Sequence, residues 1–83
     1  MVTMKKVTIQ YFALLREERG LDEEEIQTEV QTLEELYAAL KAQHHFKLDT
    51  DVLRVALNRI FVPWGSEFNN GDEVVFIPPV AGG

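Results

Sequence analysis

Apolar and polar residues alternate along the first part of the chain. From Val7 to Leu14 two sets of side chains point in opposite directions: Val7, Ile9 and Tyr11 on one side, and Thr8, Gln10 and Phe12 on the other. A period of two is typical of a β-strand that buries one face. A second half-buried strand is predicted over residues 26–30, and its closeness to the first favours antiparallel pairing. Between them, residues 13–19 are expected to form a short helical turn ended by Gly20, and residues 22–25 an acidic, solvated turn.

The hydrophobic period changes from two to about 3.6 after Thr32. The apolar positions of this segment fall on one stripe: Leu33, Leu36, Tyr37 and Leu40. Thr32 and Glu35 have the spacing of a capping box, in which each side chain accepts a hydrogen bond from the backbone N–H of the other. These signals predict a helix that begins at Thr32, runs to about Gln43 and packs its apolar stripe into the core.

Three further strands are predicted in the second half of the chain, over residues 53–57, 60–62 and 73–77. Asn58 and Arg59 form the turn between the first two, because Asn tolerates left-handed backbone angles. Residues 69–72 form a second turn cluster. The last strand is apolar at four consecutive positions, which indicates a central strand covered on both faces.

The order of these elements is strand, strand, helix, strand, strand, strand. One main helix and about five short strands predict an α+β fold in which a mixed sheet packs on the helix. This is the ubiquitin-like β-grasp arrangement. We expect the β-grasp domain to span residues 1–79 and a flexible tail to occupy residues 80–83.

Composition narrows the possible functions. The chain has 83 residues, 46% of them hydrophobic, which suits the core of one domain. It has no cysteine, so a disulfide framework and a thiolate metal site are excluded. The net charge of −6 argues against nucleic acid and against an anionic membrane surface as partners. A protein with a basic docking surface fits better, although the charge also serves solubility. No apolar run approaches the length of a membrane span and no signal peptide is evident, so we expect a cytoplasmic protein.

The C-terminal segment, PPVAGG from Pro78 to Gly83, is the strongest functional signal. Glycine has no Cβ, so Gly82 and Gly83 fit a channel too narrow for other residues. The two prolines favour an extended chain, and the four residues beyond them reach on the order of 13 Å at about 3.3 Å each. We expect this arm to deliver the Gly83 carboxylate into the active site of another protein. A frayed terminus is the alternative.

The side chains show no catalytic set of their own. The sequence has neither a Ser–His arrangement nor a Gly-rich phosphate loop. His44 and His45 are adjacent, so on a helix their side chains diverge by about 100°, and no third ligand accompanies them. We therefore expect no metal, and the chemistry is assigned to the main-chain carboxylate of Gly83.

Three segments resemble the small subunit of molybdopterin synthase. Tyr11–Glu17, YFALLRE, resembles the FFAxLRE opening of that family. Asn70–Gly83, NGDEVVFIPPVAGG, resembles its DGDEVAFFPPVSGG ending, and Val55–Asn58 resembles its VAVN strand and turn. Length and element order match as well, so the resemblance covers nearly the whole chain. It implies the β-grasp fold.

The same resemblance implies a sulfur carrier that is not itself the catalyst. An E1-like activating enzyme would consume ATP to adenylate Gly83, and no cofactor would stay bound to the carrier. The acyl-adenylate would then become a thiocarboxylate. The tail would enter the large synthase subunit and pass its sulfur to cyclic pyranopterin monophosphate, forming the dithiolene of molybdopterin. The expected assembly is a heterotetramer, with two small subunits on a large-subunit dimer.

The site residues implied by the resemblance form two groups. They are the inserted tail, Val80, Ala81, Gly82 and Gly83, and the docking residues Phe12, Arg16, Ile77, Pro78 and Pro79. Ile77 stands where many members have Phe, and Ala81 where they have Ser or Thr; both departures bear on partner specificity and not on the terminal chemistry. Phe12 as a core residue and Arg16 as an ordinary surface charge remain alternatives.

Other functions share the same tail. In a ubiquitin-like protein modifier, Gly83 would form an isopeptide bond with lysines of a target. A sulfur carrier of the thiamine pathway would use the same thiocarboxylate, although such carriers are typically shorter and lack the PPVxGG lead-in. A β-grasp binding module with an inert tail is the remaining alternative.

Overall fold

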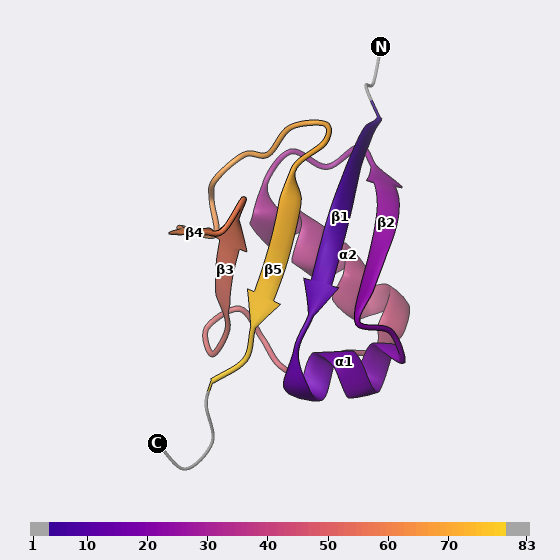
Figure 1. The fold of residues 1–83 in the computed structure, drawn as a ribbon. Helices are drawn as coiled ribbons and strands as arrows, with labels where there is room; N and C mark the ends of the chain where they lie inside the picture. Colours follow the sequence, from indigo (N-terminus) through magenta and orange to yellow (C-terminus); the bar gives the residue numbers. More distant parts are fainter. Residues whose placement is uncertain (1–3, 80–83) are drawn as a thin grey trace.

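The computed structural model describes residues 4–79, which form one mixed sheet and two helices (Figure 1). The elements in chain order are β1 (Lys5–Tyr11), α1 (Ala13–Arg19), β2 (Glu23–Thr28), α2 (Leu33–His44), β3 (Arg54–Leu57), β4 (Ile60–Val62) and β5 (Glu73–Ile77). The α+β class and the predicted order are confirmed. Neither helix of this part of the chain is long and apolar enough to cross a membrane.

The strands lie in the order β2-β1-β5-β3-β4. The two central strands, β1 and β5, run parallel, whereas every other neighbouring pair is antiparallel. Helix α2 covers one face of the sheet and leaves the other face, called here the open face, without a helix (Figure 1). Because β1 and β5 are parallel, α1 follows β1 at the same end of the sheet at which β5 ends.

The core lies between the sheet and α2. All four residues of the predicted helical stripe are buried there. They meet the inward side chains of the strands, which include Val7, Ile9, Tyr11, Val55, Val74 and Phe76. Tyr37 of α2 packs against aromatic rings at centroid distances of 5.0 Å to Phe76 and 5.7 Å to Trp64. The predicted central position of the last strand is confirmed by the strand order. The expectation that both its faces are covered is met on one face only, where α2 lies; on the open face Val75 is buried by its neighbours without a helix above it (Figure 1).

Both helices begin or end with the signals that the sequence carries. The Thr32 hydroxyl accepts from the Glu35 N–H at 3.3 Å, and the Glu35 carboxylate accepts from the Thr32 N–H at 3.1 Å. Both halves of the predicted capping box are therefore present. At the end of α1, Gly20 has the left-handed φ of 80° that was predicted for it.

The second strand differs from its prediction. It spans residues 23–28 rather than 26–30, so the expected acidic turn over residues 22–25 is largely strand. The reason is the register with β1, in which Glu23, Glu24 and Glu25 oppose Gln10, Ile9 and Thr8. Pairing with β1 gives the backbone N–H and C=O groups of this segment hydrogen-bond partners within the sheet, and this outweighs the low strand propensity of Glu.

Candidate functional site

The predicted tail residues Val80, Ala81, Gly82 and Gly83 lie outside the described residues. The predicted docking residues lie within them, at the end of the sheet from which the tail departs. Ile77 is half-buried, Pro78 is buried and Pro79 is exposed. Pro78 therefore packs onto the body of the protein, and its side chain adds little to an exposed contact surface.

Phe12 and Ile77 lie at the same corner of the open face. Tyr11 and Phe76 are partners in the parallel pair, and both point into the core. Side chains alternate along extended backbone, so Phe12 and Ile77, which follow Tyr11 and Phe76, face the other way. Phe12 has the extended backbone that this requires, with φ −127° and ψ 153°. Phe12 is 45% exposed, so the alternative that it is a core residue is wrong.

Arg16 is brought to the same corner by α1. Together with Gln10, Phe12, Asp22 and Glu23 it lines a shallow hollow beside the end of β1. Its Nε atom lies 3.6 Å from the Asp22 Oδ1 atom, and both side chains are largely exposed. An exposed pair of this kind contributes little to stability, so Arg16 is free to exchange Asp22 for a partner's carboxylate.

The sheet extends the apolar surface beyond the residues expected from sequence. Phe61 of β4 is paired with Ala56 of β3, and Ala56 with Val75 of β5. Phe61 is 52% exposed, while Ala56 and Val75 are nearly covered by their neighbours. We call the outward residues Phe12, Ala56, Phe61, Val75 and Ile77 the sheet patch. Its three additional members were missed because their facing depends on the order of the strands.

A charged residue lies over one side of the sheet patch. The guanidinium carbon of Arg54 lies 3.9 Å from the centroid of the Phe61 ring. Arg54 is also the cross-strand neighbour of Ile77, at the end of β5. A cation over an aromatic face at this distance is attracted by the ring's quadrupole.

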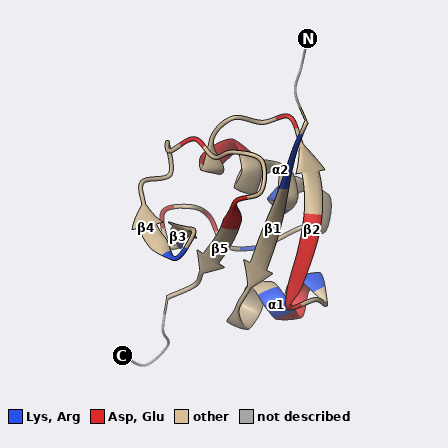
Figure 2. Ribbon diagram, turned by 45° about the horizontal axis from the view of Figure 1, so that its top comes forward, with Lys and Arg blue, Asp and Glu red and all other residues tan. Residues whose placement is uncertain are grey.

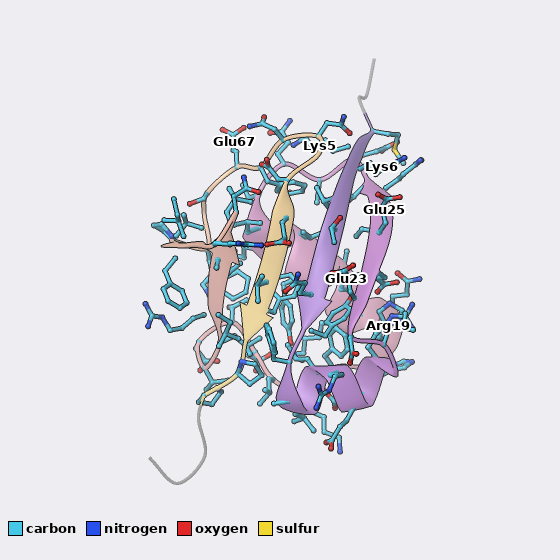
Figure 3. All side chains as sticks on the ribbon, in the orientation of Figure 1. Lys5, Lys6, Arg19, Glu23, Glu25 and Glu67 are labelled. Atoms are coloured by element: carbon cyan, nitrogen blue, oxygen red, sulfur yellow. The ribbon has the colours of Figure 1, made fainter. Side chains whose placement is uncertain are left out.

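The open face carries acidic residues on β2 and at the start of β5. Glu23 and Glu25 line β2 (Figures 2 and 3), and Glu73 begins β5. The Gln10 amide joins the two strands by donating to Glu23 at 3.2 Å and to Glu73 at 3.1 Å. The open face is thus divided into an apolar half near the tail and an acidic half over β2.

A partly buried hydrogen-bond network fastens α1 to the sheet. Arg19 donates to both carboxylate oxygens of Glu24, at 2.7 and 2.8 Å, and the Tyr11 hydroxyl donates to Glu24 at 2.6 Å. The hydrogen bonds from Arg19 hold the pKa of Glu24 below its usual value, while burial raises the pKa of Tyr11. Because α1 carries Arg16 and directly follows Phe12, this network also positions those two residues.

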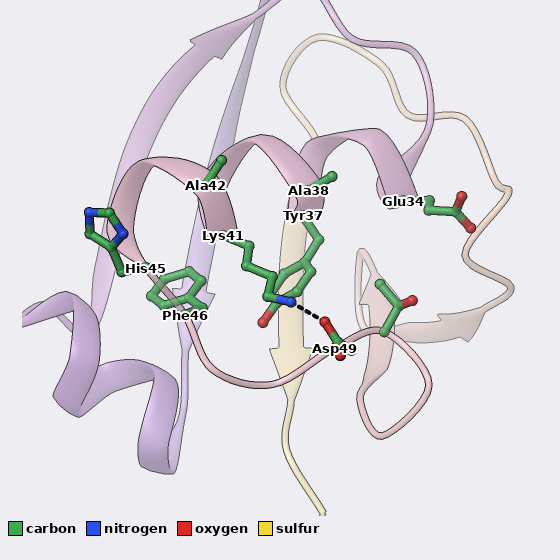
Figure 4. Close-up of a pocket in the computed structure, with 9 residues that line it drawn as sticks. Glu34, Tyr37, Ala38, Lys41, Ala42, His45, Phe46 and Asp49 are labelled. Carbon is green, nitrogen blue, oxygen red and sulfur yellow. Dashed lines mark hydrogen bonds and ion pairs between the residues drawn. The ribbon is translucent and has the colours of Figure 1, made fainter.

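The opposite side of the molecule has a groove beside α2 (Figure 4). Three of its polar side chains are engaged within the chain: Lys41 contacts Asp49, and the Tyr37 hydroxyl donates to the Leu48 carbonyl at 2.6 Å. His45 lines this groove, whereas His44 lines a different pocket with Arg19. Within residues 4–79, no group of three or more His, Cys, Asp or Glu could hold a metal ion.

Comparison with known proteins shows the family of this chain. The ThiS family model matches residues 9–83. The chain is 34% identical over 80 residues to the molybdopterin synthase sulfur carrier subunit of Escherichia coli, with 93% of this chain and 99% of that protein covered.

Two solved structures are similar in fold and over nearly the full length. The SAMP1 protein of Haloferax volcanii superposes with a TM-score of 0.77 at 25% identity, covering 94% of this chain and 99% of that one. A chain from the complex of subunits 1 and 2 of the molybdopterin-converting factor of Helicobacter pylori gives a TM-score of 0.63 at 26% identity, with the same coverage of 94% and 99%.

Proposed function

The chain belongs to the ThiS family, and from this premise we propose that it is the sulfur carrier subunit of a molybdopterin synthase. A thiocarboxylate on Gly83 donates sulfur to cyclic pyranopterin monophosphate and so builds the molybdopterin dithiolene. The observation that carries the proposal is the 34% identity with the carrier subunit of Escherichia coli over nearly the whole of both chains. We place the reaction in the cytoplasm.

The chemistry needs no catalytic side chain on the carrier. A terminal carboxylate has a pKa of about 3.5 and is ionised at neutral pH, which makes it a poor electrophile. An E1-like enzyme activates it: a Gly83 oxygen attacks the α-phosphorus of ATP and pyrophosphate leaves. A donor that supplies sulfur as hydrosulfide then attacks the acyl carbon and AMP leaves with the activated oxygen, so that one carboxylate oxygen is replaced by sulfur. ATP is consumed in the activating enzyme, so the carrier itself holds no cofactor.

The fold supports this role by giving the tail a fixed starting point. β5 pairs with β1 on one side and with β3 on the other, and Ile77 at its end is paired with Arg54. A central strand held on both sides does not move relative to the body. The four residues after Pro79 therefore start from a fixed point, and their length limits how far from that point Gly83 can lie.

We assign the sheet patch to docking of the large synthase subunit. It includes Ile77, the last residue of β5, and extends from there across β3 to β4, so a partner that receives the tail would lie beside it. Exposed Phe12 and Phe61 are apolar and aromatic, which is typical of residues that dominate binding energy at protein interfaces. The Helicobacter pylori structure is a complex of two subunits of molybdopterin-converting factor, which agrees with a two-subunit assembly here. The heterotetramer is part of the proposal.

The test is reconstitution with the activating enzyme, a sulfur donor, ATP and the large subunit. We expect the intact mass of the chain to rise by the replacement of one oxygen with sulfur at Gly83. Deleting Gly83, or changing Gly82→Val, should abolish dithiolene formation and leave the unfolding temperature unchanged, since a β-branched side chain cannot follow glycine through a narrow channel. Gly65→Ala is the matched control, because a Cβ there meets nothing within 4 Å. Dithiolene formation by the Gly83 deletion would refute the proposal.

A protein modifier is the second candidate, because the small archaeal modifier protein 1 of Haloferax volcanii has a similar fold. It predicts higher-mass conjugates in cell lysate that disappear when Gly83 is deleted. Affinity capture distinguishes a thiamine-pathway carrier from the proposed function, because such a carrier would capture a thiazole synthase and not the large subunit of molybdopterin synthase.

A further inference from the structure

Arg54 differs from the other arginines of the chain in its pairing. Arg16, Arg19 and Arg59 each lie within 4 Å of a carboxylate of this protein, belonging to Asp22, Glu24 and Glu73 respectively. Within residues 4–79, Arg54 makes no ion pair and its guanidinium makes no hydrogen bond. This is unusual for a chain with 14 acidic residues and only 8 basic ones.

The position of the Arg54 guanidinium is nevertheless defined. It lies over the Phe61 ring with its central carbon 3.9 Å from the ring centroid. A guanidinium carries five N–H donors in a fixed planar fork, and none of those of Arg54 has a hydrogen-bond acceptor within residues 4–79. Arg54 thus presents unused donors in a restricted orientation, beside the sheet patch and across from Ile77.

We propose that Arg54 is a specificity-determining residue that binds a carboxylate of the large synthase subunit at the mouth of the channel that receives the tail. The inference rests on the proposed function and adds the chemistry of the partner at one point. Ile77 is the last residue of β5, so whatever lies opposite Arg54 in the complex lies next to the entry of the tail. Guanidinium and carboxylate form paired, charge-assisted hydrogen bonds of defined geometry.

The physical role of the contact is to set the docking register. The sheet patch is apolar and admits small sliding movements at little cost. The planar Arg54 guanidinium, restricted by Phe61, donates to a carboxylate in few orientations and loses little side-chain entropy when it binds. On an otherwise acidic protein, a positive group at this corner also selects a partner that is acidic at one place within a basic surface.

The experiment measures the dissociation constant between the full chain and the isolated large subunit by titration calorimetry, at low and at high salt. Arg54→Met keeps an apolar stem over Phe61 and removes the charge. Arg54→Lys keeps the charge and loses the planar fork. Arg59→Met is the matched control, since it removes the same charge from the turn of the same hairpin, where the Arg59 side chain is 88% exposed.

We expect Arg54→Met to weaken binding about tenfold or more, Arg54→Lys to fall between it and the wild type, and Arg59→Met to stay within about twofold. The loss should shrink at high salt, and sulfur transfer by thiocarboxylated Arg54→Met should recover at saturating large subunit. Binding of Arg54→Met equal to that of Arg59→Met would overturn the inference while leaving the sulfur-carrier function intact. Failure of the wild type itself to bind the large subunit would overturn both. Circular dichroism and the thermal midpoint, which should match the wild type, show that each variant is folded.

Discussion

Replacing Phe61 with alanine tests whether the sheet patch is the docking surface. A phenylalanine side chain buries about 150–250 Å² when it is fully covered. In the free protein Phe61 is 52% exposed, so about 100 Å² is left for a partner to cover. At about 25 cal/mol per Å², complete covering is worth about 2.5 kcal/mol, or about a 60-fold change in the dissociation constant.

The assay is titration of the large subunit with each variant, accompanied by urea unfolding of the free chain. We expect Phe61→Ala to weaken binding toward that limit and to lower the free energy of unfolding by up to about 2.5 kcal/mol, because roughly half of the ring is buried in the free chain. Both quantities come from the same preparation, so a folding defect would be recognised as such.

Ile60→Ala is the matched control on the same strand. Ile60 is 65% exposed, more than Phe61, and is paired with Leu57 instead of Ala56. Since successive side chains of a strand point to opposite faces, Ile60 points away from the sheet patch. Its truncation should leave binding within about twofold. If Phe61→Ala binds like the wild type, or if Ile60→Ala weakens binding as much, the assignment of the sheet patch to docking is wrong.

Two further predictions concern stability. Glu24→Gln should lower the free energy of unfolding by about 1–3 kcal/mol near pH 7, because it weakens the partly buried hydrogen bonds from Arg19 and Tyr11. The pKa of Glu24 is lowered in the folded protein, so its contribution to the free energy of unfolding is present above the unfolded pKa of about 4.3 and is lost as pH falls through the folded value. Urea unfolding from pH 7 to pH 3 should therefore show the free energy of unfolding of the wild type converging on that of Glu24→Gln. A difference between the two proteins that does not change with pH would contradict the network. Arg59→Gly should raise the free energy of unfolding by up to about 1 kcal/mol, because Asn58 and Arg59 have φ of 51° and 73° and glycine adopts such angles without strain. A lower thermal midpoint for Arg59→Gly would show that the pair with Glu73 outweighs that strain.

Local signals in the sequence predicted the elements whose stabilising contacts are close along the chain. The capping box of α2 joins residues three positions apart, and Gly20 ends α1 by its own backbone conformation. The alternation in β1 correctly separated core residues from those of the open face. The proposed terminal chemistry also depends on local features, because a Gly-Gly end is recognised in the sequence without reference to any distant residue.

The candidate site was only partly predictable, since most of it is made by strands that are distant in sequence. Phe12 and Ile77 were expected to act together on the strength of a resemblance, but it is the parallel pairing of β1 with β5 that puts them at one corner. Phe61 gave no signal of its own, because β4 has three residues and too short a pattern to show which face is buried. Its place in the sheet patch follows from its pairing with Ala56.

The sequence by itself determined the fold class, the main helix and the chemistry expected at the C-terminus, because these depend on periodicity, capping and residue type within short segments. The tertiary structure decided the extent of β2, the hydrogen bonds of Glu24 to Arg19 and Tyr11, the membership of the sheet patch and, within residues 4–79, the unpaired state of the Arg54 guanidinium. Each of these depends on strand order and register, which are set by the summed burial of the whole sheet against α2 and not by the residues of one segment.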